Sequence, residues 1–192
     1  MPSHTRQLAD FATNLKLSDV PPEVVARAKS IILDGLGCGL FGVHLKWTEI
    51  LAGVVQRLEP QGGMASIWGG GATASATSAA LVNGTMIQGY ELDDANPASI
   101  HSCAAVLPVV FAAAELLGAD KVDGETLLTA IIAGFEVGPR VGLCMNGNKM
   151  LGKGWHTPGL FGPFPAAVAA GRVLGLDSEQ IFQALGIAGP QA

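Results

Sequence analysis

The sequence is poor in charged, aromatic and cysteine residues. Charged side chains make up 14% of its 192 residues and aromatic side chains 6%, whereas hydrophobic residues make up 49%. A chain with so little charge must bury much of its surface, inside its own core or against another domain or subunit, and we expect the second. The 11 Lys and Arg residues are scattered singly, and the formal net charge is −5. We therefore expect no nucleic-acid binding, because that function requires clustered cations.

The sequence also lacks the marks of a secretory or membrane protein. Residues 1–10 show no basic head followed by an apolar stretch, as a signal peptide would. The longest strongly apolar run, residues 103–114, is shorter than the ~20 residues that span a bilayer, and it contains Pro108. We expect no membrane-spanning segment.

Cysteine is limited to Cys38, Cys103 and Cys144, which lie far apart in apolar surroundings. An odd number of widely spaced cysteines predicts buried free thiols in a reducing compartment. This composition predicts a cytoplasmic protein.

Apolar residues recur at helical spacing along most of the chain, which predicts one all-α domain over residues 1–192. Asp123 is expected to cap one helix, and Asp177 with Gln180 forms a capping box for the last. Close backbone approach is expected at the glycines of 35–42. The expected helices cover 5–15, 21–36, 48–58, 75–88, 104–117, 124–144, 165–174 and 181–188, with a brief strand at 65–68 and a loop at 146–154.

An acidic turn is the strongest local feature. Glu91, Asp93 and Asp94 place three carboxylates within four residues, and such groups repel one another unless a cation, a protonated partner or water relieves them. His101 follows just ahead of an expected helix and could supply that relief, or act as a general acid or base near neutral pH. The structural alternative is an exposed acidic turn followed by a histidine at a helix start.

A second histidine lies between a Gly-rich loop and a helix that starts at Pro158. His156 would point into the cavity that nearby helix starts share, where backbone N–H groups favour an anionic ligand. Alternatively, His156 packs beside Trp155 and bonds to a backbone carbonyl. Lys149 and Lys153 could hold a carboxylate from the same loop, or remain solvated.

Other kinds of site lack support. The glycines at 69–71 are not followed by Gly-Lys-Ser/Thr, so a phosphate loop is not expected, and no Gly-x-Ser-x-Gly marks a serine nucleophile. His101, Cys103, Asp93 and His156 lack the paired spacing of a zinc site. We expect neither a metal nor a cofactor.

Several segments, taken together and in order, resemble the MmgE/PrpD family: 20–38, 80–84, 91–108 and 154–176. The family includes 2-methylcitrate dehydratase, cis-aconitate decarboxylase and iminodisuccinate epimerase. The resemblance implies a cofactor-independent enzyme, usually a homodimer, with a large helical domain and a smaller α+β lid. Its site would lie between the two and act on small di- or tricarboxylates.

The resemblance also implies roles for particular residues. The histidines of the family's amino-terminal half fall on His101 and His156, and its aspartate-rich turn falls on the acidic turn. Such an enzyme moves a proton next to a carboxylate and so dehydrates, decarboxylates or epimerises its substrate. We predict catalytic roles for His101, His156 and Asp93, and substrate binding by Glu91, Asp94 and Lys153.

Two positions depart from the family pattern. Glu91 stands where the decarboxylase has aspartate, and Ala95 stands where threonine is frequent, which removes a hydroxyl donor. These departures argue against cis-aconitate decarboxylation as the specific reaction. Family members are more than twice as long, so we expect an amino-terminal part without the lid. Its partner would be a second copy or a lid-bearing half, and the alternative to an enzyme is a non-catalytic helical interaction subunit.

Overall fold

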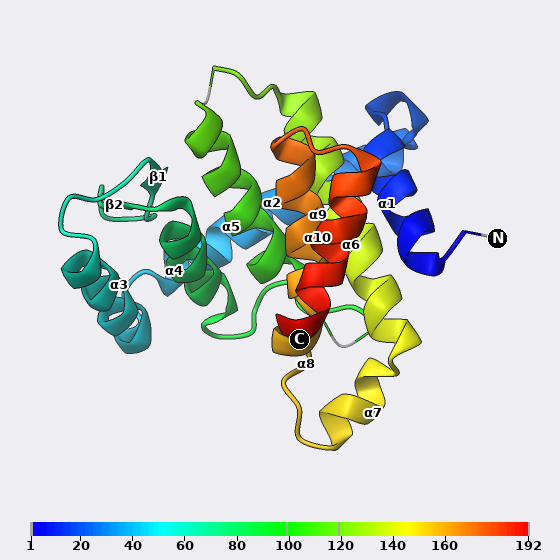
Figure 1. Cartoon of the computed structure of the whole chain (residues 1–192). Coiled ribbons are helices and arrows are strands. Elements are labelled where there is room, and N and C mark those ends of the chain that lie inside the picture. The colour runs from blue at the N-terminus through cyan, green and yellow to red at the C-terminus, as the bar shows by residue number, and fades with distance from the viewer. Residues whose placement is uncertain (1, 99, 119, 192) are drawn as a thin grey trace.

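The computed structural model describes residues 2–98, 100–118 and 120–191, and helices dominate it (Figure 1). The all-α prediction is confirmed, apart from one very small sheet. The α-helices are α1 (His4–Asn14), α2 (Pro22–Gly42), α3 (Lys46–Leu58), α4 (Ala76–Gln88), α5 (Ser102–Leu117), α6 (Gly124–Cys144), α7 (Gly147–Gly152), α8 (Thr157–Phe161), α9 (Pro163–Val173) and α10 (Ser178–Ala188).

Helix α5 lies in the middle of the fold (Figure 1). Its side chains are almost all apolar, and Val106, Leu107 and Val110 are completely buried. Helices α2 and α4 pack against it, as do α6 and α9. Because α5 has no polar face, it must be covered on most sides, as the low charge of the chain leads one to expect of its core.

A two-stranded antiparallel sheet lies against α4 and α5. Strand β1 (Ala65–Ser66) pairs with β2 (Thr73–Ala74), so that Ala65 faces Ala74. The side chain of Asn83 on α4 holds this hairpin: its Oδ1 accepts from Trp68 N–H at 3.0 Å, and its Nδ2 donates to Ser66 O at 2.9 Å. One buried amide therefore ties the loop to the helix.

Helix α2 is longer than the sequence predicted. It continues past residue 36 to Gly42, because its glycines let neighbouring elements approach closely. A Cβ on Gly42 would meet the carbonyl of Met86 on α4, and one on Gly35 would lie 2.5 Å from Leu107 on α5. Gly37 is different, since nothing lies within 4 Å of its would-be Cβ. The face of α2 that carries Gly37 is open.

Two expectations are wrong. Residues 146–154 were expected to form a loop, but α7 forms there, started by Asn146, whose side chain accepts from Lys149 N–H at 3.3 Å. The three thiols are free, but only Cys103 is buried; Cys38 is partly buried and Cys144 is exposed. Cys144 is exposed because it is the last residue of α6, where the helix leaves the core.

Helix α6 alone among the described helices is long and apolar enough to cross a membrane by length and composition, with a mean hydropathy of 1.5 over its best window. Half of that window is buried inside the fold, where α6 packs against α9 and α5. Core helices of soluble proteins commonly have the same properties, so they are weak evidence for a span.

Candidate active site

The acidic turn begins where α4 ends. After Gln88 the chain turns sharply, and Glu91 has a φ of 51°, the left-handed conformation that side chains other than Gly and Asn rarely adopt. Leu92 is then exposed, whereas Asp93 is buried. Neighbouring side chains of the turn thus point into different surroundings, Leu92 toward solvent and Asp93 into the fold.

Asp94 closes the start of α5. Its Oδ1 accepts from Cys103 N–H at 2.6 Å and its Oδ2 from Ser102 N–H at 3.3 Å. These are unpaired amide groups of the first helical turn, where a carboxylate is stabilised by both the hydrogen bonds and the helix dipole. Both oxygens of Asp94 therefore hold backbone in this structure, and its predicted binding of substrate remains a prediction.

Asp93 and His101 form a buried pair. His101 Nδ1 lies 3.1 Å from Asp93 Oδ1. The Asp93 side chain is fully buried, and that of His101 is 17% exposed. The other oxygen, Asp93 Oδ2, is also buried and has no hydrogen-bond partner among the described residues. A carboxylate that holds one imidazole nitrogen leaves the second nitrogen free to exchange a proton.

Burial raises the pKa of Asp93 to about 6, from its ordinary value of 3.8. The charge of His101 acts in the opposite direction and Asp94 in the same direction, but desolvation is the larger cause. A carboxyl group with such a pKa changes its charge near neutral pH, as acid and base groups of active sites do.

The loop between Asp93 and His101 is packed against α6. Ala98 and Ile100 are buried in a small cluster with Phe161 of α8. A Cβ on Gly142 would lie 2.9 Å from that of Ala98, and one on Gly147 would meet the Ala98 carbonyl. Helix α6 and the start of α7 can approach this loop only because these positions have no side chain.

Asn96 ties the same loop together, and sequence reasoning missed it. Its Oδ1 accepts from Ala98 N–H at 3.1 Å, and its Nδ2 donates to Ile100 O at 2.8 Å. The same Nδ2 donates to Ser102 Oγ at 3.3 Å. The dipeptide Asn96-Pro97 is a typical turn signal and could have identified this residue.

His156 approaches the same acidic turn from α8. Its Nε2 lies 3.9 Å from Glu91 Oε1, beyond hydrogen-bonding distance. The two side chains are 61% and 63% exposed. Trp155 is also exposed, so the expected alternative of a histidine packed in beside it does not describe this structure. Both predicted histidines therefore lie beside carboxylates of the acidic turn: His101 beside the buried Asp93, and His156 beside the exposed Glu91.

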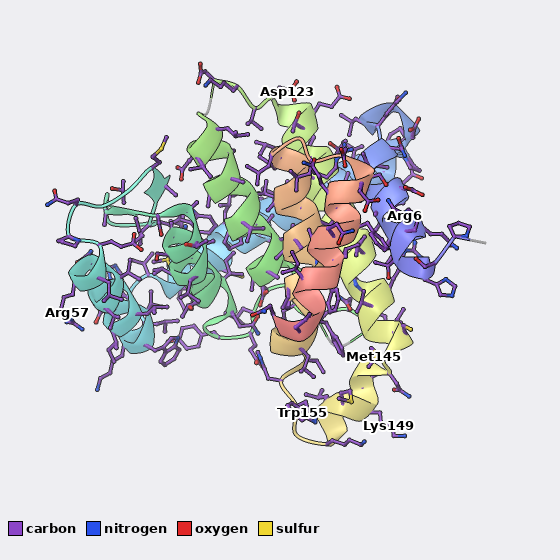
Figure 2. The ribbon with its side chains drawn as sticks, viewed as in Figure 1. Arg6, Arg57, Asp123, Met145, Lys149 and Trp155 are labelled. Carbon is purple, nitrogen blue, oxygen red and sulfur yellow. The ribbon has the colours of Figure 1, made fainter. Side chains whose placement is uncertain are left out.

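Lys153 is exposed at the end of α7, in the part of the fold where Lys149 and Trp155 lie (Figure 2). In the described structure no ion pair or hydrogen bond joins Lys153 to the acidic turn. Its predicted role in substrate binding is untested. The described residues also contain no group of three or more His, Cys, Asp or Glu side chains that could hold a metal ion.

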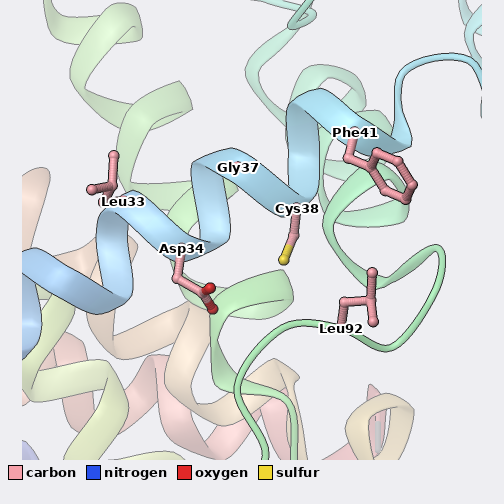
Figure 3. Close-up of a pocket in the computed structure, with 6 residues that line it drawn as sticks. All are labelled: Leu33, Asp34, Gly37, Cys38, Phe41 and Leu92. Atoms are coloured by element: carbon pink, nitrogen blue, oxygen red, sulfur yellow. The ribbon is translucent and has the colours of Figure 1, made fainter.

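A cavity of about 660 Å³ opens on the free face of α2, and sequence reasoning did not predict it. Figure 3 shows Asp34 and Cys38 pointing from α2 toward the loop that carries Leu92. Burial raises the pKa of Cys38, and the charges of Asp34, Asp93 and Asp94 raise it further. The cavity therefore adjoins the acidic turn. Its walls are formed by Leu33, Asp34, Gly37, Cys38, Phe41 and Leu92.

The fold is thus a helical scaffold in which one turn carries two histidine–carboxylate pairs, one in contact at 3.1 Å and the other 3.9 Å apart. The sequence model of the MmgE/PrpD N-terminal domain matches residues 6–192. The chain belongs to the MmgE/PrpD family.

The chain is similar to curated proteins of this family along nearly its whole length. It is 42% identical over 193 aligned positions to the cis-aconitate decarboxylase-like protein oryM of Aspergillus oryzae, covering 98% of this chain and 40% of that protein. It is 39% identical to cis-aconitate decarboxylase of Aspergillus terreus, covering 98% of this chain and 39% of the relative. The human cis-aconitate decarboxylase is 33% identical, with 97% and 39% covered. The chain thus spans about two fifths of the length of these relatives.

Proposed function

We propose that this chain carries the histidine–carboxylate part of the active site of a lyase or isomerase that acts on a small di- or tricarboxylate. The observation that supports it is the buried contact between His101 and Asp93. The names of the relatives, cis-aconitate decarboxylases, indicate the same substrate class. Dehydration, decarboxylation and epimerisation all require a proton to be moved next to a carboxylate.

In this mechanism His101 is the general acid or base, and Asp93 orients it. With Nδ1–H donated to Asp93, the lone pair of Nε2 takes the proton from the carbon, and the electrons of that C–H bond pass into the carboxylate as an enolate-like charge. The intermediate then loses hydroxide or recovers a proton on the opposite face. In the decarboxylation variant His101 begins protonated on both nitrogens: the C–C bond to the leaving carboxylate breaks, carbon dioxide departs, and the carbon that keeps the electron pair takes the proton of Nε2.

The more exposed residues act on the substrate in this proposal. His156 binds a substrate carboxylate or shares the proton transfer, while Glu91 and Lys153 contribute polar contacts at the open side. Cations and hydrogen-bond donors placed where negative charge develops stabilise the transition state. The proposal requires no cofactor.

The test is proton exchange with solvent. The purified chain is incubated in D₂O with cis-aconitate, citrate or another small di- or tricarboxylate, and NMR follows deuterium uptake and carbon dioxide loss. His101→Gln should slow the reaction by about 10²–10⁴-fold, the usual contribution of a general acid or base. The matched control is His44→Gln, which removes an exposed histidine outside the acidic turn. A measurable wild-type rate that both variants retain equally would exclude His101 as the acid or base.

A second function is favoured by the open face of α2. Leu33 is 74% exposed and Phe41 is 63% exposed, beside the α2 cavity. A non-catalytic helical interaction subunit would dock its partner there. The occupant we propose is a lid-bearing segment equivalent to the rest of the relatives' length, with a homodimer as the other outcome. Light scattering of the chain, alone and mixed with such a segment, distinguishes the two, and a monomer that binds neither would contradict docking.

A further inference from the structure

Asn96 makes three hydrogen bonds that all end within six residues of itself. Its amide oxygen accepts from Ala98 N–H, and its amide nitrogen donates to Ile100 O and Ser102 Oγ. The last two acceptors belong to the residues directly before and after His101. The amide therefore holds the backbone on both sides of the imidazole.

The other attachments of the loop involve different groups from those that Asn96 holds. Asp94 fixes the beginning of the loop to the first turn of α5, and Ala98 and Ile100 rest on α6 and α8. Neither attachment involves the carbonyl of Ile100 or the hydroxyl of Ser102, the two groups beside His101 that Asn96 holds. Each unconstrained backbone residue retains about 1–2 kcal/mol of conformational entropy, so loss of the Asn96 hydrogen bonds would give the backbone at His101, and with it the imidazole, more freedom to move.

We propose that Asn96 is a positioning residue, which fixes His101 so that its Nδ1 faces Asp93 and its Nε2 remains available to substrate. This inference rests on the proposed function, because an oriented imidazole matters to the reaction only if His101 moves a proton. The hydrogen bonds of Asn96 go to neither Asp93 nor the imidazole, so it acts through the groups on either side of His101 that it holds.

A single orientation of the ring predicts a single tautomer. When Nδ1 is held beside a carboxylate, its proton is favoured there, and the neutral ring has its lone pair on Nε2. When the loop is released, the ring turns away from Asp93 and both tautomers become populated. A change confined to overall stability would not alter this ratio in the molecules that remain folded.

The experiment is an NMR measurement of the imidazole nitrogens of the ligand-free chain at a pH of about 8, above the ordinary titration range of histidine. The chain has 4 histidines, and His101 is assigned by the loss of its signals in His101→Gln. In the wild type we expect the Nδ1–H tautomer to predominate. In Asn96→Ala the tautomer ratio should fall about tenfold, the change that 1.4 kcal/mol produces.

Two further variants separate positioning from folding. Asn96→Asp retains an oxygen for Ala98 N–H but loses the donor to Ile100 and Ser102, so it should shift the ratio as Asn96→Ala does. The matched control is Asn83→Ala, which removes an amide that ties the β1 loop to α4 in the same manner. It should lower stability and leave the His101 ratio unchanged.

The tautomer ratio of His101 in these variants decides the proposal. An unchanged tautomer ratio in folded Asn96→Asp overturns the proposal, as does an equal shift in Asn83→Ala. Because the measurement uses no substrate, it also separates this inference from the proposed function. A chain without proton-exchange activity can still show the ratio change, and an active chain can fail to show it.

Discussion

The two histidine–carboxylate pairs begin from one turn and differ in nearly every physical respect. Asp93 and His101 are in contact at 3.1 Å, and the carboxylate is fully buried. Glu91 and His156 are 3.9 Å apart, and both are more than half exposed. An exposed pair contributes little to stability because water screens it, whereas a buried carboxylate without its partner is costly. The buried pair is therefore preorganised by the fold, and the exposed pair is free to rearrange around a ligand.

The largest expected effect comes from removing each histidine in turn. His101→Ala leaves Asp93 buried without a partner, so we expect the free energy of unfolding at pH 7 to fall by about 3–5 kcal/mol. His156→Ala should lower it by less than about 1 kcal/mol, because both side chains of its pair are solvated. Urea unfolding of the two variants measures the difference. Similar losses would mean that the two pairs are not distinct in solution.

The next effect concerns the charge of Asp93. Its pKa in the folded protein is about 6 and its ordinary value is 3.8, so the folded protein binds this proton more tightly than the unfolded chain. The stability that the group contributes is fully present below a pH of about 4 and is lost as the pH rises through about 6. Asp93→Asn removes the dependence, and at pH 7 it should be more stable than the wild type by up to about 3 kcal/mol.

Urea unfolding midpoints of Asp93→Asn and of the wild type, measured at several pH values from about 4 to about 7.5, test this prediction. The matched variant is Glu91→Gln in the exposed pair, whose stability should follow the wild type throughout. If the stability of Asp93→Asn and that of the wild type change with pH in the same way, folding does not raise the pKa of Asp93. Although it is more stable, Asp93→Asn should lose proton-exchange activity, because the asparagine amide does not select the tautomer of His101 as the carboxylate does.

A third comparison uses two glycines of α7. A Cβ on Gly147 would meet the carbonyl of Ala98, whereas nothing lies within 4 Å of one on Gly152. Gly147→Ala should push the loop that carries His101 away from α6 and lower stability by about 1–3 kcal/mol. Gly152→Ala should be neutral or slightly stabilising, because alanine favours a helix. Urea unfolding gives the energies, and the His101 signals should move in Gly147→Ala only.

The parts of the fold that the sequence predicted are those with a local cause. The end of α6 at Cys144 and the capping box of Asp177 and Gln180 follow from apolar spacing and from short-range hydrogen bonds. Helix α7 was missed because its glycines have low helix propensity, and contacts with the distant Ala98 loop hold it.

The candidate site shows the same limit. The acidic turn and both histidines were identified from residue type, but their pairing depends on the path of the loop from Asp93 to His101. That path is set by Asn96 and by contacts with α6, which no local pattern encodes. The contact of the Asp94 side chain with the first turn of α5 was not predicted either, because the helix starts two residues earlier than expected. Substrate binding by Asp94 stays a prediction.

The smallest expected effect concerns the backbone that presents the exposed pair. Glu91 has a φ of 51°, a conformation that asparagine adopts more readily than glutamate. Glu91→Asn should therefore raise the free energy of unfolding by up to about 1 kcal/mol, relief of part of the strain that such a residue stores. Glu91→Gln removes the same charge and keeps the long side chain, so the difference between the two variants isolates the backbone. If Glu91→Asn is no more stable than Glu91→Gln, the turn is not held in this conformation in solution. The exposed carboxylate would then be placed by a ligand or partner instead of by the fold.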